Sequence, residues 1–252
     1  GMPPLVVHMR RNNEASEGDL GKVLPASPLR LAYLESHTLA SAYRAVSANK
    51  LQDAEHEFRS LLYMLVLTPA VDDTEAQRIS ELMGECREYL IGISIELERR
   101  ALATSEPDQV ARILELAALF THVQMQPQHQ MLALRIAMME ARRVGNLAMA
   151  GHFARRLIEL QPPAKVVQVA QQIVSLSDRQ PRDVVPVPSY SVHETDYVVC
   201  AGSHTLIPAG GANAVLDPLT GAKYLPEFRG TLCKVSGISE VGRFATGLRN
   251  LA

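Results

Sequence analysis

The stretch DTEAQRISELMGECREYLIGISIELERRALA (residues 73–103) decides the fold class of this 252-residue chain. Its apolar side chains recur every three or four residues, which places them on one face of an α-helix. At about 1.5 Å per residue, such a helix is about 45 Å long. Thr74 and Gln77 have the spacing of a capping box and mark the expected start. We therefore predict a long central helix whose apolar stripe consists of Ile79, Leu82, Met83, Cys86, Leu90, Ile93 and Leu97.

The same helical periodicity appears on both sides of this stretch. Asn146, for example, stands at an expected N-cap, directly before a new apolar stripe. The segments 51–62 and 147–158 also share several apolar and small residues at the same offsets, as in tetratricopeptide-like hairpins. We predict a mainly α protein with an α-solenoid over residues 27–180. Its helical hairpins, tetratricopeptide-like in part, use about seven helices: the central one and those near 27–46, 49–65, 105–120, 127–139, 146–158 and 162–173.

Both ends of the chain differ from this pattern. Residues 1–26 show no sustained period, and we expect a mobile N-terminal arm. After about residue 180 the helical period disappears, and more than half of the chain's 15 glycines follow Pro186. Short β-branched or apolar runs alternate there with turn residues. We predict an extended linker and a small β-rich module packed on the helices over residues 181–252, with strands near 197–200, 205–207, 231–235 and 244–248 and a turn at 217–221.

Composition narrows the classes of function. The chain has 25 Lys and Arg against 27 Asp and Glu, a net charge of −2, which does not favour nucleic acid as a partner. No run approaches the ~18 apolar residues of a transmembrane helix, and no leader resembles a signal peptide. Three cysteines are too few for a secreted disulfide scaffold. We expect a cytoplasmic protein with reduced thiols that binds other proteins.

Candidate metal ligands are sparse. Cys200 and Cys233 flank the β-rich module, and His193, His204 or Asp217 could complete a tetrahedral zinc site. Structural zinc sites usually contain closely spaced cysteine pairs, and this sequence has none. We therefore predict no metal and no other cofactor. Cys86 lies on the apolar stripe of the central helix and is expected in the core.

Candidate catalytic residues are equally sparse. His122 and His129 flank Pro127 and could act as acid or base, but no nucleophile with an orienting carboxylate stands near them. We predict that the protein is not an enzyme. An alternative function is a helical-repeat peptide-binding adaptor with a basic groove, formed by Arg142, Arg143, Arg155 and Arg156. Aromatic residues are the other candidate partner contacts: Tyr43, Phe58, Tyr190, Tyr197, Tyr224 and Phe228.

Five blocks of sequence, in order along the chain, resemble a known family. They are REYLIGISIELERR (87–100), AALFTHVQMQPQHQMLALR (117–135), FARRLIEL (153–160), DPLTGAKYLPEFRGTLCKV (217–235) and EVGRFATGLR (240–249). Together they are similar to the C-terminal domain of the alpha subunit of coatomer, the COPI vesicle coat.

The resemblance implies a structural role without catalysis. It implies a fragment of a coat protein that binds the epsilon subunit and contacts other coatomer subunits. The expected process is Golgi-to-endoplasmic-reticulum retrograde and intra-Golgi transport. The expected location is cytoplasmic, peripheral on Golgi membranes and coated vesicles, with membrane association through the coat.

The sequence departs from the family at one cluster. Family members typically carry cysteines in a CPLSGACY-like stretch and on both sides of it, a knuckle that looks able to bind metal. Here the four positions are Cys200, Asp217, Lys223 and Cys233. An ammonium replaces one thiolate, so a four-sulfur site is excluded. We expect the module to keep its shape by packing on the helices.

Overall fold

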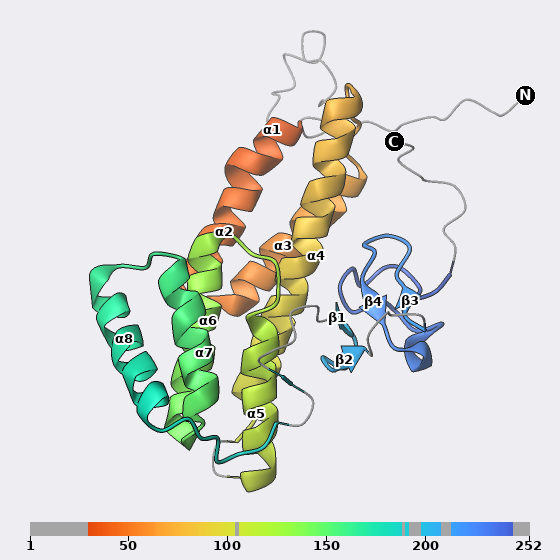
Figure 1. Ribbon diagram of the computed structural model, residues 1–252. Coiled ribbons are helices and arrows are strands. Elements are labelled where there is room, and N and C mark those ends of the chain that lie inside the picture. The colour runs from red at the N-terminus through yellow and green to blue at the C-terminus, as the bar shows by residue number, and fades with distance from the viewer. Residues whose placement is uncertain (1–29, 104–105, 188–189, 192–197, 208–212, 244–252) are drawn as a thin grey trace, which may run out of the picture.

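The computed structural model describes residues 30–103, 106–187, 190–191, 198–207 and 213–243. From α2 to α8, consecutive helices pack on one another as antiparallel hairpins, and α1 extends α2 at one end of the array (Figure 1). The chain is mainly helical with small sheets near its C-terminal end, which confirms the predicted fold class. The helices are α1 (Leu31–Tyr33), α2 (Ala40–Ser47), α3 (Leu51–Val66), α4 (Asp73–Ala101), α5 (Pro107–Phe120), α6 (Pro127–Val144), α7 (Leu147–Glu159) and α8 (Ala164–Arg179).

The long central helix is α4, and its start differs from the prediction. The carboxylate of Asp72 accepts the N–H of Glu75 at 2.8 Å, and the Glu75 carboxylate accepts the N–H of Val71 at 2.7 Å. The capping pair is therefore Asp72 and Glu75, and the predicted pair Thr74 and Gln77 is wrong. The predicted stripe is buried at Ile79, Leu82, Cys86, Leu90 and Ile93, and Tyr89, Ile91 and Ile95 are buried beside it. The helix thus contacts neighbours on two sides.

The first predicted helix is continuous but not α-helical throughout. A π-helical segment, η2 (Leu34–Leu39), lies between α1 and α2. Within it the Ser36 hydroxyl donates to the carbonyl oxygen of Ala32 at 2.7 Å, so a side chain competes for a carbonyl of the preceding turn. The expected start of this helix near residue 27 and the N-terminal arm at 1–26 lie outside the described residues.

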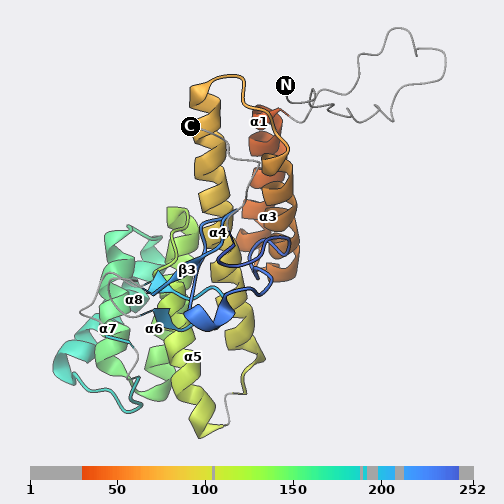
Figure 2. The same ribbon diagram turned by 90° about the vertical axis from the view of Figure 1, so that its right-hand side faces the viewer.

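The C-terminal strands are very short. β1 (Val198–Val199) pairs with β2 (Leu206–Ile207), and β3 (Val215–Leu216) pairs with β4 (Lys223–Tyr224), both antiparallel. The strands lie along the flank of α4 and α5 (Figure 2). The strands predicted near 197–200 and 205–207 are confirmed. The strand predicted at 231–235 is wrong, because the described backbone there makes only an isolated bridge, Leu232 to Glu240. The predicted strand at 244–248 lies outside the described residues.

Asn146 fixes the path of the chain after α8. It occupies the N-cap position of α7, but its side chain does not cap the helix. Its Oδ1 accepts the N–H groups of Val184 and Val185 at 2.8 Å each, and its Nδ2 donates to the Val185 carbonyl oxygen at 2.8 Å. Because this side chain is only 1% exposed, its three hydrogen bonds hold the linker against the start of α7.

Candidate functional site

Three of the four knuckle side chains, those of Cys200, Asp217 and Cys233, are engaged by the protein's own hydrogen bonds. Sγ of Cys200 accepts the N–H of Leu225 at 3.3 Å, and Sγ of Cys233 lies 3.2 Å from the Tyr224 hydroxyl oxygen. The Asp217 carboxylate accepts the N–H and hydroxyl of Thr220 at 2.8 and 2.6 Å. Lys223 is exposed on β4. Among the described residues, no group of three or more His, Cys, Asp or Glu side chains could hold a metal ion. His193, one of the possible ligands, lies outside them.

Side chains of three helices hold the module through its backbone. Arg112 of α5 donates to the carbonyl oxygens of Ser203 and His204 at 2.9 and 3.2 Å. Arg87 of α4 donates to the Thr220 carbonyl at 3.0 Å, and the Tyr63 hydroxyl of α3 donates to the Ser236 carbonyl at 2.6 Å. These contacts to loop carbonyls explain how short strands keep a fixed position on the helices. Nothing in the sequence distinguishes these three residues, since polar residues on the exposed faces of helices are common.

The two aromatic candidates in the module differ in accessibility. Tyr224 is 0% exposed, and its hydroxyl accepts the N–H of Lys234 at 2.9 Å, so it is a core residue and no partner can reach it. Phe228 is partly buried. A Cβ at Gly202 would lie 2.6 Å from its ring, so glycine is required for this packing. Of the other candidates, Phe58 and Tyr190 are buried, Tyr43 is half-buried, and Tyr197 lies outside the described residues.

His204 joins the module to α4 through a hydrogen bond to Glu98. Its Nδ1 contacts one carboxylate oxygen of Glu98. Arg112 donates to the other oxygen of the same carboxylate at 2.8 Å. Burial lowers the pKa of His204, and its hydrogen bond to Glu98 only partly offsets this. The hydrogen bonds from His204 and Arg112 outweigh burial at Glu98 and lower the pKa of that carboxyl. Nε2 of His204 has no hydrogen-bond partner among the described residues.

The two histidines considered as catalytic candidates, His122 and His129, are parts of the packed interior. His129 is 2% exposed, with Nδ1 at 2.7 Å from the Tyr89 hydroxyl and Nε2 at 2.9 Å from the Ser47 hydroxyl. Burial lowers its pKa. Burial, with smaller contributions from Arg156 and His152, lowers the pKa of His122 to about 4. Nε2 of His122 lies 3.0 Å from the Tyr190 hydroxyl. These contacts fix neutral rings and give neither histidine the arrangement of a general base.

The four candidate arginines make contacts in different places. Arg143 of α6 pairs with Glu140 at 2.9 Å, and Arg142 makes no ion pair among the described residues. Arg155 of α7 pairs with Asp178 of α8, while Arg156 donates to the Thr121 hydroxyl and carbonyl at 3.0 Å each. The residues that these arginines contact do not hold all four guanidinium groups in one place.

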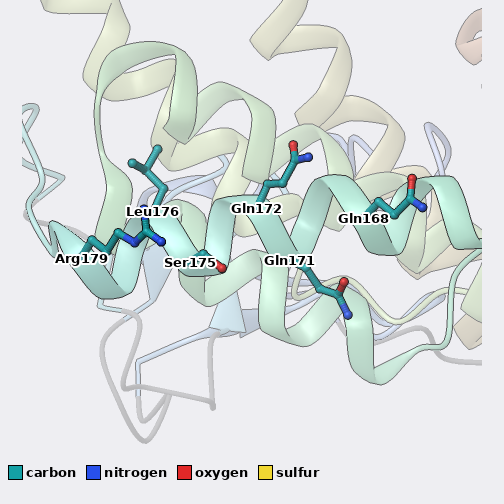
Figure 3. Close-up of a pocket in the computed structure, with 6 residues that line it drawn as sticks. All are labelled: Gln168, Gln171, Gln172, Ser175, Leu176 and Arg179. Carbon is teal, nitrogen blue, oxygen red and sulfur yellow. The ribbon is translucent and has the colours of Figure 1, made fainter.

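The surface cavities in the described part of the chain include the following two. One, of about 590 Å³, lies along α8 and is lined by residues of that helix alone: Gln168, Gln171, Gln172, Ser175, Leu176 and Arg179 (Figure 3). The other, of about 460 Å³, lies between the C-terminal end of α4 and the outer face of α6. It contains buried Glu96 and a set of arginines. Neither cavity contains a nucleophile beside a base. No described helix has the length and apolar character needed to cross a membrane.

Comparisons with known proteins give one consistent result. A family model for the C-terminus of the coatomer (COPI) alpha subunit matches residues 1–252. The putative coatomer subunit alpha of Schizosaccharomyces pombe is 33% identical over 252 residues, covering 100% of this chain and 20% of that protein. The Dictyostelium discoideum subunit is 32% identical over 228 residues (87% and 18%), and that of Saccharomyces cerevisiae is 32% identical over 208 residues (82% and 17%). This chain spans about a fifth of the length of these relatives. It belongs to the family formed by the C-terminal part of the coatomer alpha subunit.

Proposed function

We propose that this chain is the part of a coatomer alpha subunit that binds the epsilon subunit. As a family member it is a component of the coatomer coat, and its relatives are structural subunits. The match of the family model to the whole chain carries the proposal. The epsilon contact itself comes from the resemblance of the five sequence blocks to the alpha C-terminal domain.

The architecture supports a scaffold role. The helices share one apolar core that runs from Leu31 in α1 to Ile173 in α8 and includes residues of the C-terminal module. A continuous core of this kind makes a stiff platform, because its packed side chains do not rearrange independently. Stable docking of another subunit requires such a surface, with about 1,200–2,000 Å² buried in total.

The proposed setting is the vesicle coat. We propose that the chain acts in Golgi-to-endoplasmic-reticulum retrograde and intra-Golgi transport, on the cytoplasmic side of Golgi membranes and coated vesicles. Attachment to the membrane would run through the assembled coat, and further coatomer subunits would be its other partners.

Isothermal titration calorimetry with the purified epsilon subunit of the same organism tests the proposal. We expect a one-to-one complex with a large negative heat-capacity change, since apolar surface becomes buried. The full-length alpha subunit serves as the positive control for an active epsilon preparation. If the full-length subunit binds and a longer alpha tail that contains this chain does not, the proposed epsilon contact is wrong.

A further inference from the structure

The second cavity has a charged wall and an apolar wall. We call it the α4–α6 groove and define it by Arg99, Arg100, Leu132, Arg135, Ile136 and Met139. The arginines at 99 and 100 belong to the last turn of α4, and the other four residues belong to α6. Such a combination can recognise both charge and apolar surface.

The charged wall carries an excess of positive charge. Glu96 is 1% exposed and accepts from both Arg99 and Arg100, at 2.7–2.8 Å, so its negative charge is enclosed by guanidinium groups. Arg99 also donates to Glu140 at 2.9 Å. The lining therefore holds three arginines against two glutamates, a net charge of 3 − 2 = +1. Arg142 and Arg143 lie outside the lining, at the next turn of α6, and add two positive charges beside it.

The ion pairs also fix the positions of these guanidinium groups. The Arg99 side chain is 13% exposed and is held by two carboxylates, and Arg100 bonds Asn49 as well as Glu96. A helix C-terminus attracts basic residues in any protein, which could account for Arg99 and Arg100. It does not account for Arg135, which is exposed in the middle of α6 and makes no ion pair among the described residues.

The apolar wall follows one face of a helix. Leu132, Ile136 and Met139 are spaced by four and three residues, so their side chains form a stripe along α6. Met139 is 43% exposed, so a partner can reach its side chain. Methionine adapts its shape to a partner's side chains. A stripe with this spacing fits an amphipathic helix, which presents its own apolar residues at matching intervals.

From these observations we propose that the α4–α6 groove binds an acidic amphipathic helical segment of a partner protein. Apolar residues of the segment contact Leu132, Ile136 and Met139, and its carboxylates face Arg100, Arg135 and Arg142. The charge excess selects acidic partners and speeds their association, and added salt weakens the attraction. The inference names a second surface and does not depend on binding of the epsilon subunit.

Fluorescence anisotropy with a labelled synthetic peptide tests the proposal. The probe has leucines at helical spacing on one face and glutamates on the other, and a scrambled peptide of the same composition serves as its control. We expect the amphipathic peptide to bind the whole chain at least about tenfold more tightly than the scrambled one, a difference of about 1.4 kcal/mol. Equal binding of the two peptides would overturn the proposal.

Charge-reversal variants locate the site. The double variant Arg135→Glu, Arg142→Glu should weaken binding by at least about tenfold and should improve binding of a lysine version of the peptide. The double variant Lys165→Glu, Arg179→Glu makes the same change in net charge on an exposed face of α8 and should leave binding unchanged. Equal weakening by the groove and α8 variants would show nonspecific attraction and would refute the site.

Two further measurements separate the alternatives. Vesicles containing phosphatidylserine should not compete with the peptide; displacement of the peptide by vesicles would assign the groove to a lipid surface and refute the proposal. Binding of the epsilon subunit to the groove variants is measured by titration, separately from peptide binding. Failure of epsilon to bind a longer alpha tail that contains this chain would contradict the proposed function, while the peptide result alone decides the groove.

Discussion

The helical array and the C-terminal module reach a fixed structure by different means. The array buries large apolar side chains, such as Phe58, which is 0% exposed and stacks on Tyr89 with ring centroids 4.4 Å apart. The module has four strands of two residues each among its described residues and depends on side chains of α3, α4 and α5 that bond its loop carbonyls. The array is therefore stabilised mainly by apolar area, whereas the module, which also adds residues to the shared core, needs polar contacts from the helices to fix its loops.

The largest expected effect is loss of core packing in the array. Phe58→Ala removes a fully buried ring and should lower the free energy of unfolding by about 3–5 kcal/mol, measured by urea denaturation. Tyr33→Ala is the matched control, because that ring is 50% exposed and its loss should cost less than about 0.5 kcal/mol. Similar losses for the two variants would contradict the view that buried area stabilises the array.

Removal of one polar clamp should affect the module selectively. Arg112→Met keeps most of the apolar stem but leaves the Ser203 and His204 carbonyls, Glu98 and Glu115 without this donor. We expect a loss of about 2–3 kcal/mol in module docking, since hydrogen bonds to charged groups contribute more than neutral ones. Limited proteolysis should cut within residues 198–243 well before the helices. Simultaneous cleavage of both regions would show that they open as one unit.

Acidification should weaken both regions. Burial lowers the folded-state pKa of His122 (to about 4), His129 and His204, so the unfolded chain binds more protons as the pH falls below about 6.5. Stability should therefore decrease from about pH 7 toward pH 4, and the lowered pKa of Glu98 extends the loss to lower pH. Urea midpoints across this range measure the effect. His204→Gln should flatten the pH dependence of module proteolysis, and a midpoint that rises on acidification would contradict the assignment.

The smallest expected effect lies at the surface of the array. Arg155 and Asp178 form an ion pair with side chains 48% and 59% exposed. Arg155→Met should change the free energy of unfolding by less than about 0.5 kcal/mol, because exposed pairs gain little over water. Any difference should vanish in high salt. A loss as large as that of Arg112→Met would show that exposure does not separate the two kinds of arginine.

The helical array could be predicted from the sequence because the apolar residues that stabilise it recur with the period of an α-helix. Burial of Ile79, Leu82 and Cys86 on one face of α4 follows from their spacing alone. Helix ends were predicted less well: three consecutive residues at the start of α4, Asp72, Asp73 and Thr74, have capping side chains, and only the backbone conformation selects Asp72. The position of Asn146 at the start of α7 was predicted, but the role of its side chain was not. Its amide hydrogen-bonds to a linker almost forty residues further along the chain.

The module and the groove could be predicted only in part. Turn residues marked the hairpin between β3 and β4, but a two-residue strand is too short to show alternation. The clamps Arg87 and Arg112 bond backbone carbonyls, which have no signature in sequence. The α4–α6 groove combines residues from two helices and includes Arg135, which had no distinguishing pattern. In contrast, Lys223 alone was enough to exclude a four-cysteine site at the knuckle positions.

The three cysteines give each region its own internal reporter. Cys86 lies in the array and Cys200 and Cys233 lie in the module, and all three are free thiols with 0% exposure. Burial raises the pKa of Cys86 to about 12, so it remains protonated and unreactive while it is enclosed. A thiol-labelling reagent can therefore modify each cysteine only when its surroundings open. Mass spectrometry of the labelled peptides would give the order in which the two regions open, without any engineered probe.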